Sequence, residues 1–325
     1  MLIVRTPFRI SFFGGGTDFA DYYETHGGCV LSTTIDKYCY LSIRSLPPFF
    51  DYRSQLTYSS IERFNNPEEV RHPLVRAALT FLPVDRIQIG YDADLPASSG
   101  IGSSSAFAVG LLQGLHAMRG EYPDRMTLAK EAIHLERDMC REAGGVQDQL
   151  AAAFGGLNRM DFSGEGFHVT PLPVPEERLK ALQENLLLLF TGFTHFSGDV
   201  AKEQQKNIPT TLEQLDEMKH MVSISSELLL SGDLNDFGLL LHHTWELKRS
   251  LSNRITNYDI DLLYQRLRSA GALGGKLLGA GGGGFMLVYV PKEKQEAFRR
   301  IFGEYRIVPF AFESAGTSII YRNDS

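Results

Sequence analysis

Pro96-Ala-Ser-Ser-Gly-Ile-Gly-Ser-Ser-Ser-Ala106 is the stretch of sequence that decides how this chain folds. It follows a predicted strand, residues 86–91, and leads into a predicted apolar-periodic helix, residues 103–118. The glycines allow backbone N–H groups to curl around an anion, and the helix adds the positive end of its dipole. Three successive serines supply hydroxyls for phosphate oxygens or a metal ion. The pattern predicts a phosphate-binding loop that is not a Walker A loop, since no Gly-Lys-Ser/Thr follows; the alternative is a flexible turn with a serine N-cap.

Two further glycine-rich stretches flank this loop in the sequence. In Arg5-Thr-Pro-Phe-Arg-Ile-Ser-Phe-Phe-Gly-Gly-Gly-Thr-Asp18, two arginines interrupt an apolar strand, so one or both are predicted to point into a site. In Lys276-Leu-Leu-Gly-Ala-Gly-Gly-Gly-Gly-Phe285, the glycines allow two backbones, or a backbone and a ligand, to approach closely. The alternatives are an arginine salt bridge with a glycine turn in the first stretch and a strand-entry turn in the second.

Length, charge and cysteine content exclude several classes of protein. The 325 residues are enough for about two domains, and the formal net charge of -7 argues against a general nucleic-acid binder. No apolar run approaches the roughly 18 residues that a membrane helix needs, and the first residues lack the pattern of a signal peptide. Cys29, Cys39 and Cys140 show no metal-ligand spacing. Reduced thiols in a cytoplasmic enzyme are therefore predicted.

Strands and helices alternate without a regular βαβ rhythm, which favours an α+β fold over a doubly wound sheet. Pro171, Pro173 and Pro175 mark the predicted boundary between two domains, residues 1–172 and 173–325. The predicted strands cover residues 2–13 with a break at Pro7, 30–35 paired with 38–43, 86–91, 185–191, 285–290, 309–312 and 317–321. The predicted helices cover residues 68–82, 103–118, 128–143, 147–154, 211–231, 234–251, 258–270 and 292–302.

Together the three glycine-rich stretches resemble the motifs of the GHMP kinases, in the same order and spacing, from Val4 to about Ile320. The resemblance implies a first domain like domain 2 of ribosomal protein S5, a ferredoxin-like second domain, and phosphoryl transfer from ATP with Mg²⁺. It places the ATP contacts in the central motif, at Pro96, Ser98, Ser99, Gly100, Ile101, Gly102, Ser103, Ser104 and Ser105.

The resemblance also implies catalytic and metal-binding roles. Ser104 and Glu136 match the family's magnesium ligands, and both are hard oxygen donors of the kind that Mg²⁺ prefers. Asp148 matches the catalytic aspartate, and Arg9 matches the basic residue that contacts this aspartate and the transferred phosphate. A helix N-terminus and Arg9 both favour the ionised form of Asp148, which then acts as a general base or as an electrostatic orienter of the hydroxyl. A solvated carboxylate at Glu136 and a helix N-cap at Asp148 are the structural alternatives.

The substrate class follows from a departure from the galactokinases. They carry Glu-His where this chain has Gly15-Gly16, whereas Thr17-Asp18 is shared, so a sugar larger than galactose is predicted. The motifs look most like those of the heptose 7-phosphate 1-kinases, which implies a small sugar phosphate as substrate and a 1,7-bisphosphate as product. The substrate contacts are predicted at Gly15, Gly16, Thr17, Asp18, Gly145, Lys248, Gly281 and Gly282.

The substrate phosphate requires cations. Lys248 and Arg249 lie beside Trp245 on one predicted helical face, and a surface pair at a helix C-terminus is the alternative. Thr194 and His195 replace an arginine that family members often carry. Other functions stay open: a kinase of an unphosphorylated sugar such as L-fucose or galactose, a non-catalytic sugar-binding relative, and a decarboxylase acting on a diphosphate. No protein partner, nucleic acid or membrane is predicted, and the oligomeric state, monomer or homodimer, is left open.

Overall fold

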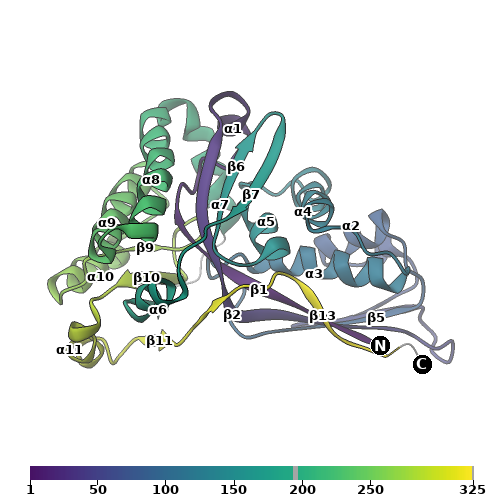
Figure 1. Ribbon diagram of the computed structural model, residues 1–325. Coiled ribbons are helices and arrows are strands. Elements are labelled where there is room, and N and C mark those ends of the chain that lie inside the picture. The colour runs from purple at the N-terminus through teal and green to yellow at the C-terminus, as the bar shows by residue number, and fades with distance from the viewer. Residues whose placement is uncertain (193–196, 324–325) are drawn as a thin grey trace.

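The computed structural model describes residues 1–192 and 197–323 and has two β-sheets, each covered by helices (Figure 1). Within these residues the larger sheet holds nine strands, ordered β13-β1-β2-β5-β3-β4, with β12 and β6 pairing with β2 and β7 pairing with β6. The smaller sheet is ordered β11-β8-β10-β9. This arrangement is the α+β fold predicted from the sequence.

The strands have the following bounds: β1 Leu2–Phe13, β2 Gly28–Ser45, β3 Ser54–Thr57, β4 Ile61–Phe64, β5 Ile87–Ala93, β6 Asn158–Ser163, β7 Gly166–Pro171, β8 Leu186–Phe190, β9 Gly274–Leu277, β10 Phe285–Tyr289, β11 Arg306–Val308, β12 Phe312–Glu313 and β13 Ser318–Arg322. The α-helices are α1 Ala20–His26, α2 Pro73–Phe81, α3 Ser103–Met118, α4 Arg125–Ile133, α5 Gln147–Phe154, α6 Glu176–Glu184, α7 Ser197–Asn207, α8 Leu212–Ser231, α9 Leu234–Ser250, α10 Tyr258–Ser269 and α11 Gln295–Ile301. A π-helical turn, His134–Met139, extends α4.

Helices α2 to α5 lie on one side of the larger sheet, and α8 to α10 lie with the smaller sheet at the other end of the molecule (Figure 1). Aromatic rings join the two halves. The ring of Phe237 on α9 lies 5.4 Å from that of Phe12 and 5.0 Å from that of Phe13, both edge-on. All three side chains are fully buried. Such edge-to-face contacts fix the end of β1 against α9, where the two halves meet.

Several predicted elements differ from those observed. Residues 30–35 and 38–43 do not pair with each other; they form one strand, β2, that pairs along its length with β1. Pro7 does not break β1, because the register shifts between Pro7 and Phe8, and a bulge tolerates a residue without an N–H. The helix predicted at 68–82 begins only at Pro73, and the one predicted at 128–143 ends in the π-helical turn at Met139.

The chain changes sheets near the predicted domain boundary. It leaves the larger sheet after β7, which ends at Pro171, and builds the smaller sheet from β8 to β11. It then returns, because β12 pairs with β2 and β13 pairs with β1. The boundary between residues 172 and 173 stays a prediction, and the last two strands complete the N-terminal sheet.

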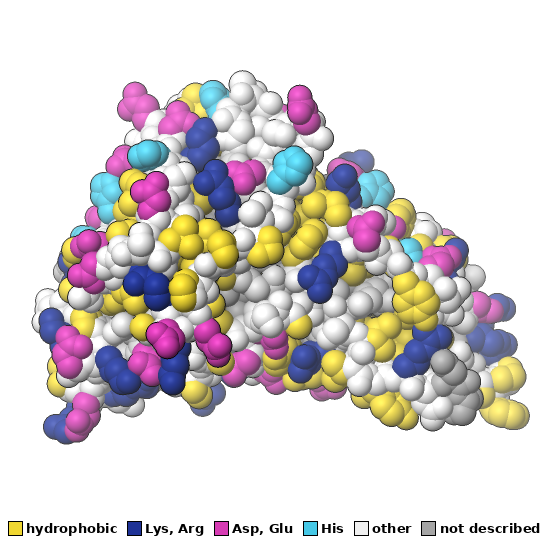
Figure 2. Space-filling model, in the orientation of Figure 1, with side chains coloured by type: hydrophobic (Ala, Val, Ile, Leu, Met, Phe, Trp, Pro, Cys, Tyr) yellow, Lys and Arg dark blue, Asp and Glu magenta, His cyan; other side chains and the backbone are white. Residues whose placement is uncertain are grey.

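None of the described helices combines the length and apolar composition needed to cross a bilayer. On the face drawn in Figure 2, the acidic and basic side chains of the described residues are interspersed, so this face carries no continuous basic patch. That distribution agrees with the formal net charge of -7.

Candidate active site

The phosphate loop joins β5 to α3, and its glycines adopt backbone that other residues rarely adopt. Gly100 and Gly102 have φ angles of +83° and +75°, and α3 begins immediately afterwards at Ser103. A Cβ atom at Gly102 would lie 3.1 Å from Cγ of Arg9 and 3.4 Å from Oδ2 of Asp148. The loop therefore turns directly over these two side chains, and the N-terminus of α3 opens beside them.

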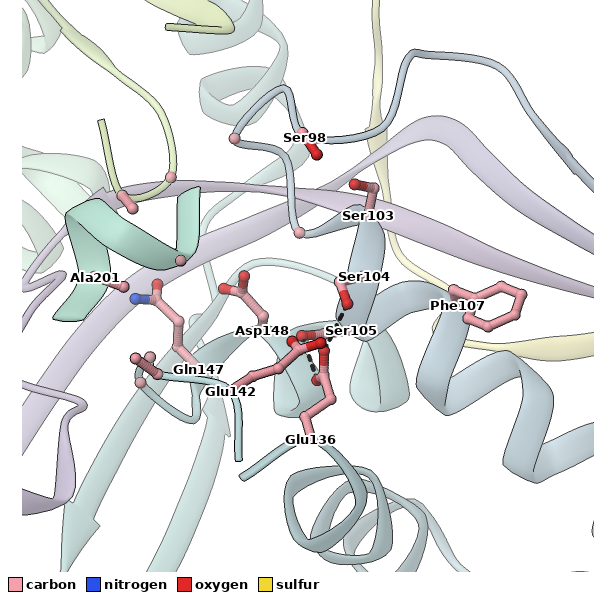
Figure 3. Close-up of a pocket in the computed structure, with 18 of the residues that line it drawn as sticks. Ser98, Ser103, Ser104, Ser105, Phe107, Glu136, Glu142, Gln147, Asp148 and Ala201 are labelled. Carbon is pink, nitrogen blue, oxygen red and sulfur yellow. Dashed lines mark hydrogen bonds between the residues drawn. The ribbon is translucent and has the colours of Figure 1, made fainter. Parts of the chain in front are cut away.

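Glu136 is buried behind this helix start and accepts three hydrogen bonds. Figure 3 draws those from Ser104 and Ser105. Ser104 Oγ donates to Oε1 at 2.8 Å, Ser105 Oγ donates to Oε2 at 2.7 Å, and Gln149 Nε2 donates to Oε2 at 2.5 Å. Glu136 lies in the π-helical turn, a feature that often occurs at functional sites. The serines of α3 and the carboxylate are thereby held together.

The oxygen atoms of Ser104 and Glu136 fit a magnesium ion as ligands. Ser104 and Glu136 offer a hydroxyl and a carboxylate at the cavity wall, and Mg²⁺ is usually held by one or two carboxylates together with phosphates and water. Among the residues that the structure describes, no three His, Cys, Asp or Glu side chains form a metal-binding cluster. A bound Mg²⁺ would therefore depend on the nucleotide phosphates as well as on these two residues.

Arg9 and Asp148 form a bidentate pair on the cavity wall. Arg9 Nε donates to Asp148 Oδ1 and Nη2 donates to Oδ2, both at 2.7 Å, while Nη1 donates to the carbonyl of Gly100 at 2.5 Å. Asp148 lies in the first turn of α5, and its carboxylate points into the cavity (Figure 3). One guanidinium therefore orients the carboxylate and the phosphate loop together.

The triple-glycine turn is organised around Asp18, which is buried. Its Oδ1 accepts from the N–H of Gly16 at 2.9 Å and its Oδ2 from the N–H of Gln147 at 3.2 Å. Burial raises the pKa of Asp18, and the nearby charge of Asp148 raises it further. A Cβ atom at Gly145 would overlap Oδ2 of Asp18, so only glycine allows the chain before α5 to pass over this carboxylate.

These elements enclose a cavity of about 810 Å³, within the range typical of small-molecule sites. The structure brings most of the predicted residues to its wall: Arg9, Gly15, Gly16, Asp18, Ser98, Gly100, Gly102, Ser103, Ser104, Ser105, Glu136, Gly145, Asp148 and Lys248. Pro96, Ser99, Ile101, Thr17, Gly281 and Gly282 lie off the wall.

The residues off the wall have structural contacts. Ser99 Oγ donates to the carbonyl of Pro96 at 2.5 Å, and the carbonyl of Ile101 accepts from the N–H of Arg9 at 3.0 Å. The buried hydroxyl of Thr17 lies 2.8 Å from the carbonyl of Gly14 and accepts from the N–H of Cys29 at 3.0 Å. Thr17 therefore fixes the turn.

The third glycine-rich stretch packs on the phosphate loop. A Cβ atom at Gly279 would overlap the backbone of Gly100, and the N–H of Phe285 donates to the carbonyl of Ser99 at 3.1 Å. Gly281 and Gly282 lie against Ile255 instead, where the N–H of Gly282 donates to its carbonyl at 2.9 Å. These glycines therefore allow two segments of backbone to pack closely against each other.

Lys248 is buried, at 6% exposure, so the alternative of a surface pair at this position is wrong. Its neighbour Arg249 points elsewhere and pairs with Asp261 at 3.0 Å. Trp245 is fully buried in the core. Thr194 and His195 fall outside the described residues.

The wall also holds residues that were not predicted, among them an aromatic group and a second lysine. The first is an aromatic end, where the ring of Phe107 lies 5.3 Å from that of His72 and 5.2 Å from that of Tyr91. Burial lowers the pKa of His72 and favours its neutral form. The second is Lys276, buried at 2% exposure. The sequence of β9, Gly-Gly-Lys-Leu, holds no local signal that marks this lysine as a wall residue.

Comparison with known proteins identifies the family. A sequence model of the GHMP kinases N terminal domain matches residues 72–156, and one of the GHMP kinases C terminal matches residues 225–306, together about half of the chain. The chain is 29% identical to the D-glycero-alpha-D-manno-heptose 7-phosphate kinase of Campylobacter jejuni over 96% of each chain. It is 24% identical to the galactokinase of Thermotoga neapolitana, over 93% of this chain and 92% of that protein.

Solved structures show the same fold. The crystal structure of a D-glycero-D-manno-heptose 1-phosphate kinase from Bacteroides thetaiotaomicron matches over 100% of each chain, with a TM-score of 0.83 and 24% identity. Lactococcus lactis galactokinase complexed with galactose matches over 98% of this chain and 94% of that one, with a TM-score of 0.74 and 18% identity. With the three motifs gathered around one cavity and both family models matched in order, this chain belongs to the GHMP kinases, ATP-dependent enzymes that phosphorylate an alcohol group.

Proposed function

We propose that this enzyme transfers the γ-phosphoryl group of ATP to the anomeric hydroxyl of D-glycero-D-manno-heptose 7-phosphate, giving the 1,7-bisphosphate. The observation that carries the transfer is the bidentate Arg9–Asp148 pair, held beneath the phosphate loop by the bond to Gly100. The choice of sugar is supported by the similarity to the Campylobacter jejuni kinase over nearly the whole chain.

The cavity offers separate places for the two substrates. The aromatic end, with Tyr58, His72, Tyr91 and Phe107, suits the purine ring by stacking. The phosphates then reach the loop and the N-terminus of α3, where backbone N–H groups and the helix dipole favour anions. When bound, Mg²⁺ at Ser104 and Glu136 neutralises phosphate charge and fixes the phosphate orientation.

The chain's own residues position the reacting hydroxyl. Asp148 accepts its hydrogen bond and orients it toward the phosphorus atom, either taking its proton or acting through charge. Arg9 holds the carboxylate in place and lies where negative charge develops on the transferred group. Phosphoryl transfer requires mainly this positioning and neutralisation.

The wall near the triple-glycine turn suits a polyhydroxylated ligand. Ser11 Oγ and Gln147 Oε1 are buried, line the cavity, and have no hydrogen-bond partner among the described residues. Buried polar atoms are normally paired, so these two are candidates for sugar hydroxyls. Gln147 lies beside Asp148 (Figure 3), which places such contacts next to the reacting group.

Two exposed cations on the cavity wall suit the phosphate of the sugar. Arg141 and Lys202 both line the cavity, and neither forms an ion pair or hydrogen bond with the described residues. Arg141 also has a φ of +55°, an unusual conformation that often accompanies a functional position.

The function is tested by ADP release with a panel of sugars. We expect turnover with D-glycero-D-manno-heptose 7-phosphate, and at least roughly tenfold lower kcat/KM with the same heptose lacking its phosphate, since charged phosphate contacts contribute about 1.5–3 kcal/mol. Mannose, galactose and L-fucose should be poorer still. Preference for an unphosphorylated sugar would overturn the proposal in favour of a fucose-type kinase. ATP binding without turnover of any sugar would favour a non-catalytic relative.

A larger side chain in the triple-glycine turn tests whether the sugar lies against this turn. A Cβ atom at Gly15 would lie 3.6 Å from Ser11 Oγ and 3.7 Å from Gln147 Nε2, which are ordinary van der Waals contacts, so the backbone there accepts a Cβ atom. Gly15→Leu should raise the KM for the sugar phosphate about tenfold or more and leave the KM for ATP unchanged. Gly15→Ala is the matched control and should be nearly neutral.

Gly16 is unsuitable for the same test, because its φ is +104° and a Cβ atom there would lie 2.6 Å from Gln204 Nε2. If Gly15→Leu raises the two KM values equally, or raises neither, the sugar does not lie against this turn.

A further inference from the structure

Two buried lysines lie in the cavity wall on the C-terminal half of the chain. Lys248 on α9 is 6% exposed and Lys276 on β9 is 2% exposed, yet both line the cavity. Lys248 Nζ donates to the carbonyls of Leu277 and Gly279 at 2.9 Å and 2.5 Å, and Lys276 Nζ donates to that of Phe12 at 2.8 Å. Neither has a carboxylate partner within the described part of the chain, although buried charges usually do.

Lys248 is connected through Gly279 to the phosphate loop. Its partner Gly279 packs against Gly100, and Gly100 accepts a hydrogen bond from Arg9, which holds Asp148. A chain of direct contacts therefore links the ammonium to the phosphate loop and to the residue that orients the acceptor. A lysine ammonium has three N–H donors, and two are used by carbonyls, so one is left for an oxygen in the cavity.

Charged side chains on several neighbouring elements influence these lysines. Arg9 on β1 and the two lysines repel one another, while Asp18 before α1 attracts both lysines and Asp148 on α5 attracts Lys248. Burial is the largest influence and lowers the pKa of Lys248 to about 7; burial and the charge of Lys248 lower the pKa of Lys276 far below its usual value. In the empty cavity near neutral pH, the pair therefore carries less than its full charge.

We propose that Lys248 and Lys276 form a cation pair that stabilises the phosphoryl group during its transfer and takes up protons when anionic substrates enter the cavity. The proposal rests on the proposed function, because it adds two cations to the same reaction. The step itself is unchanged: the bond from phosphorus to the oxygen of ADP breaks, the bond to the sugar oxygen forms, and the hydroxyl proton leaves through Asp148 or solvent.

The competing role is a contact with the phosphate that the sugar already carries. The position of Lys248 beside Gly279 and Gly100 favours the transferred group, since the loop beneath it binds the phosphates of ATP. Kinetics separate the two roles. A cation acting on the transferred group changes kcat for every sugar, whereas one holding the sugar phosphate changes KM for the phosphorylated sugar alone.

The first test compares Lys248→Met and Lys276→Met with wild type. We expect each to lower kcat roughly 10- to 100-fold, equally for heptose 7-phosphate and for the heptose without its phosphate. Lys248→Arg should restore part of the loss. Lys180→Met, which changes an exposed lysine on α6 outside the cavity, is the matched control and should behave as wild type. A rise in KM confined to the phosphorylated sugar, or unchanged kinetics, would overturn the proposal.

The second test needs no turnover. Binding of AMP-PNP, the ATP analogue with a β–γ imido bridge, is measured by calorimetry at pH 8 in buffers of different ionisation enthalpy. At this pH free Lys248 is mostly neutral, and a nearby anion raises its pKa, so wild type should take up protons on binding. The Lys248→Met/Lys276→Met double variant should bind with clearly less uptake, and thermal melting checks that it is folded.

Equal proton uptake in the folded double variant would contradict the cation pair. This outcome is distinct from failure of the proposed function, which would appear as no turnover of heptose 7-phosphate by the wild-type enzyme whatever the lysines do.

Discussion

Asp148→Asn is expected to lower kcat about 100-fold or more while leaving the affinity for ATP within about threefold of wild type. The carboxylate accepts two charge-assisted hydrogen bonds from Arg9 and faces the cavity. Asparagine keeps the shape of the side chain but removes its charge. Its NH₂ group takes the place of one carboxylate oxygen, so one of the two N–H groups of Arg9 loses its acceptor. The nucleotide contacts lie on the phosphate loop, so binding of AMP-PNP, measured by calorimetry, should survive.

A matched control is available on the surface. Asp161 also pairs with an arginine, at 2.9 Å from Arg159, but lies on β6 away from the cavity. Asp161→Asn therefore removes an arginine–aspartate pair without touching the site and should leave kcat near wild type. If Asp148→Asn also kept near-normal kcat, Asp148 would neither activate nor orient the hydroxyl, and the proposed mechanism would fail.

The elements predicted best from the sequence are those with strong end signals. The predicted bounds of α3 and α5 agree with the structure, because Gly102 precedes the first helix and Gly155 follows the second. The long strand β2 was predicted as two strands, since Asp36-Lys37 interrupts its apolar pattern. That interruption is a bulge in β2: Pro7 pairs with Tyr38 and Phe8 with Ile35, so Asp36 and Lys37 are extra residues opposite β1. A polar pair in the sequence looks the same whether it ends a strand or forms a bulge within one.

In the site, too, some residues could be predicted from the sequence and others could not. Motif residues with definite chemistry, namely Arg9, Ser104, Glu136 and Asp148, are brought together around one cavity. Glycine patterns were less informative, because a glycine that admits a ligand and one that admits another backbone look alike in sequence. Gly281 and Gly282 both pack against the backbone of Ile255. Lys276 was missed for a related reason: its position in the cavity depends on how the two sheets meet, which no local pattern contains.

Glu136→Gln should give the second large effect, a fall in kcat/KM of about 100-fold together with a higher Mg²⁺ requirement. The carboxylate is almost fully buried, and three donors, from Ser104, Ser105 and Gln149, converge on its two oxygens. Glutamine removes the negative charge that a divalent cation needs. Its NH₂ group also replaces one of the two accepting oxygens, so at least one of the three hydrogen-bond donors loses its acceptor. Electron paramagnetic resonance of Mn²⁺ in the presence of AMP-PNP should show weaker metal binding, independently of turnover.

The two neighbouring serines separate a metal ligand from a structural partner of Glu136. Each donates one hydrogen bond to the carboxylate, at 2.8 Å for Ser104 and 2.7 Å for Ser105, so each alanine variant loses a comparable contact. Ser104→Ala should also weaken Mn²⁺ binding and raise the Mg²⁺ requirement, whereas Ser105→Ala should lower activity mildly without either change. If Ser105→Ala gave the metal phenotype and Ser104→Ala did not, the ligand assignment would move by one residue. Normal Mn²⁺ binding in Glu136→Gln would exclude a metal site at this carboxylate and leave its role as the anchor that holds α3 to the π-helical turn.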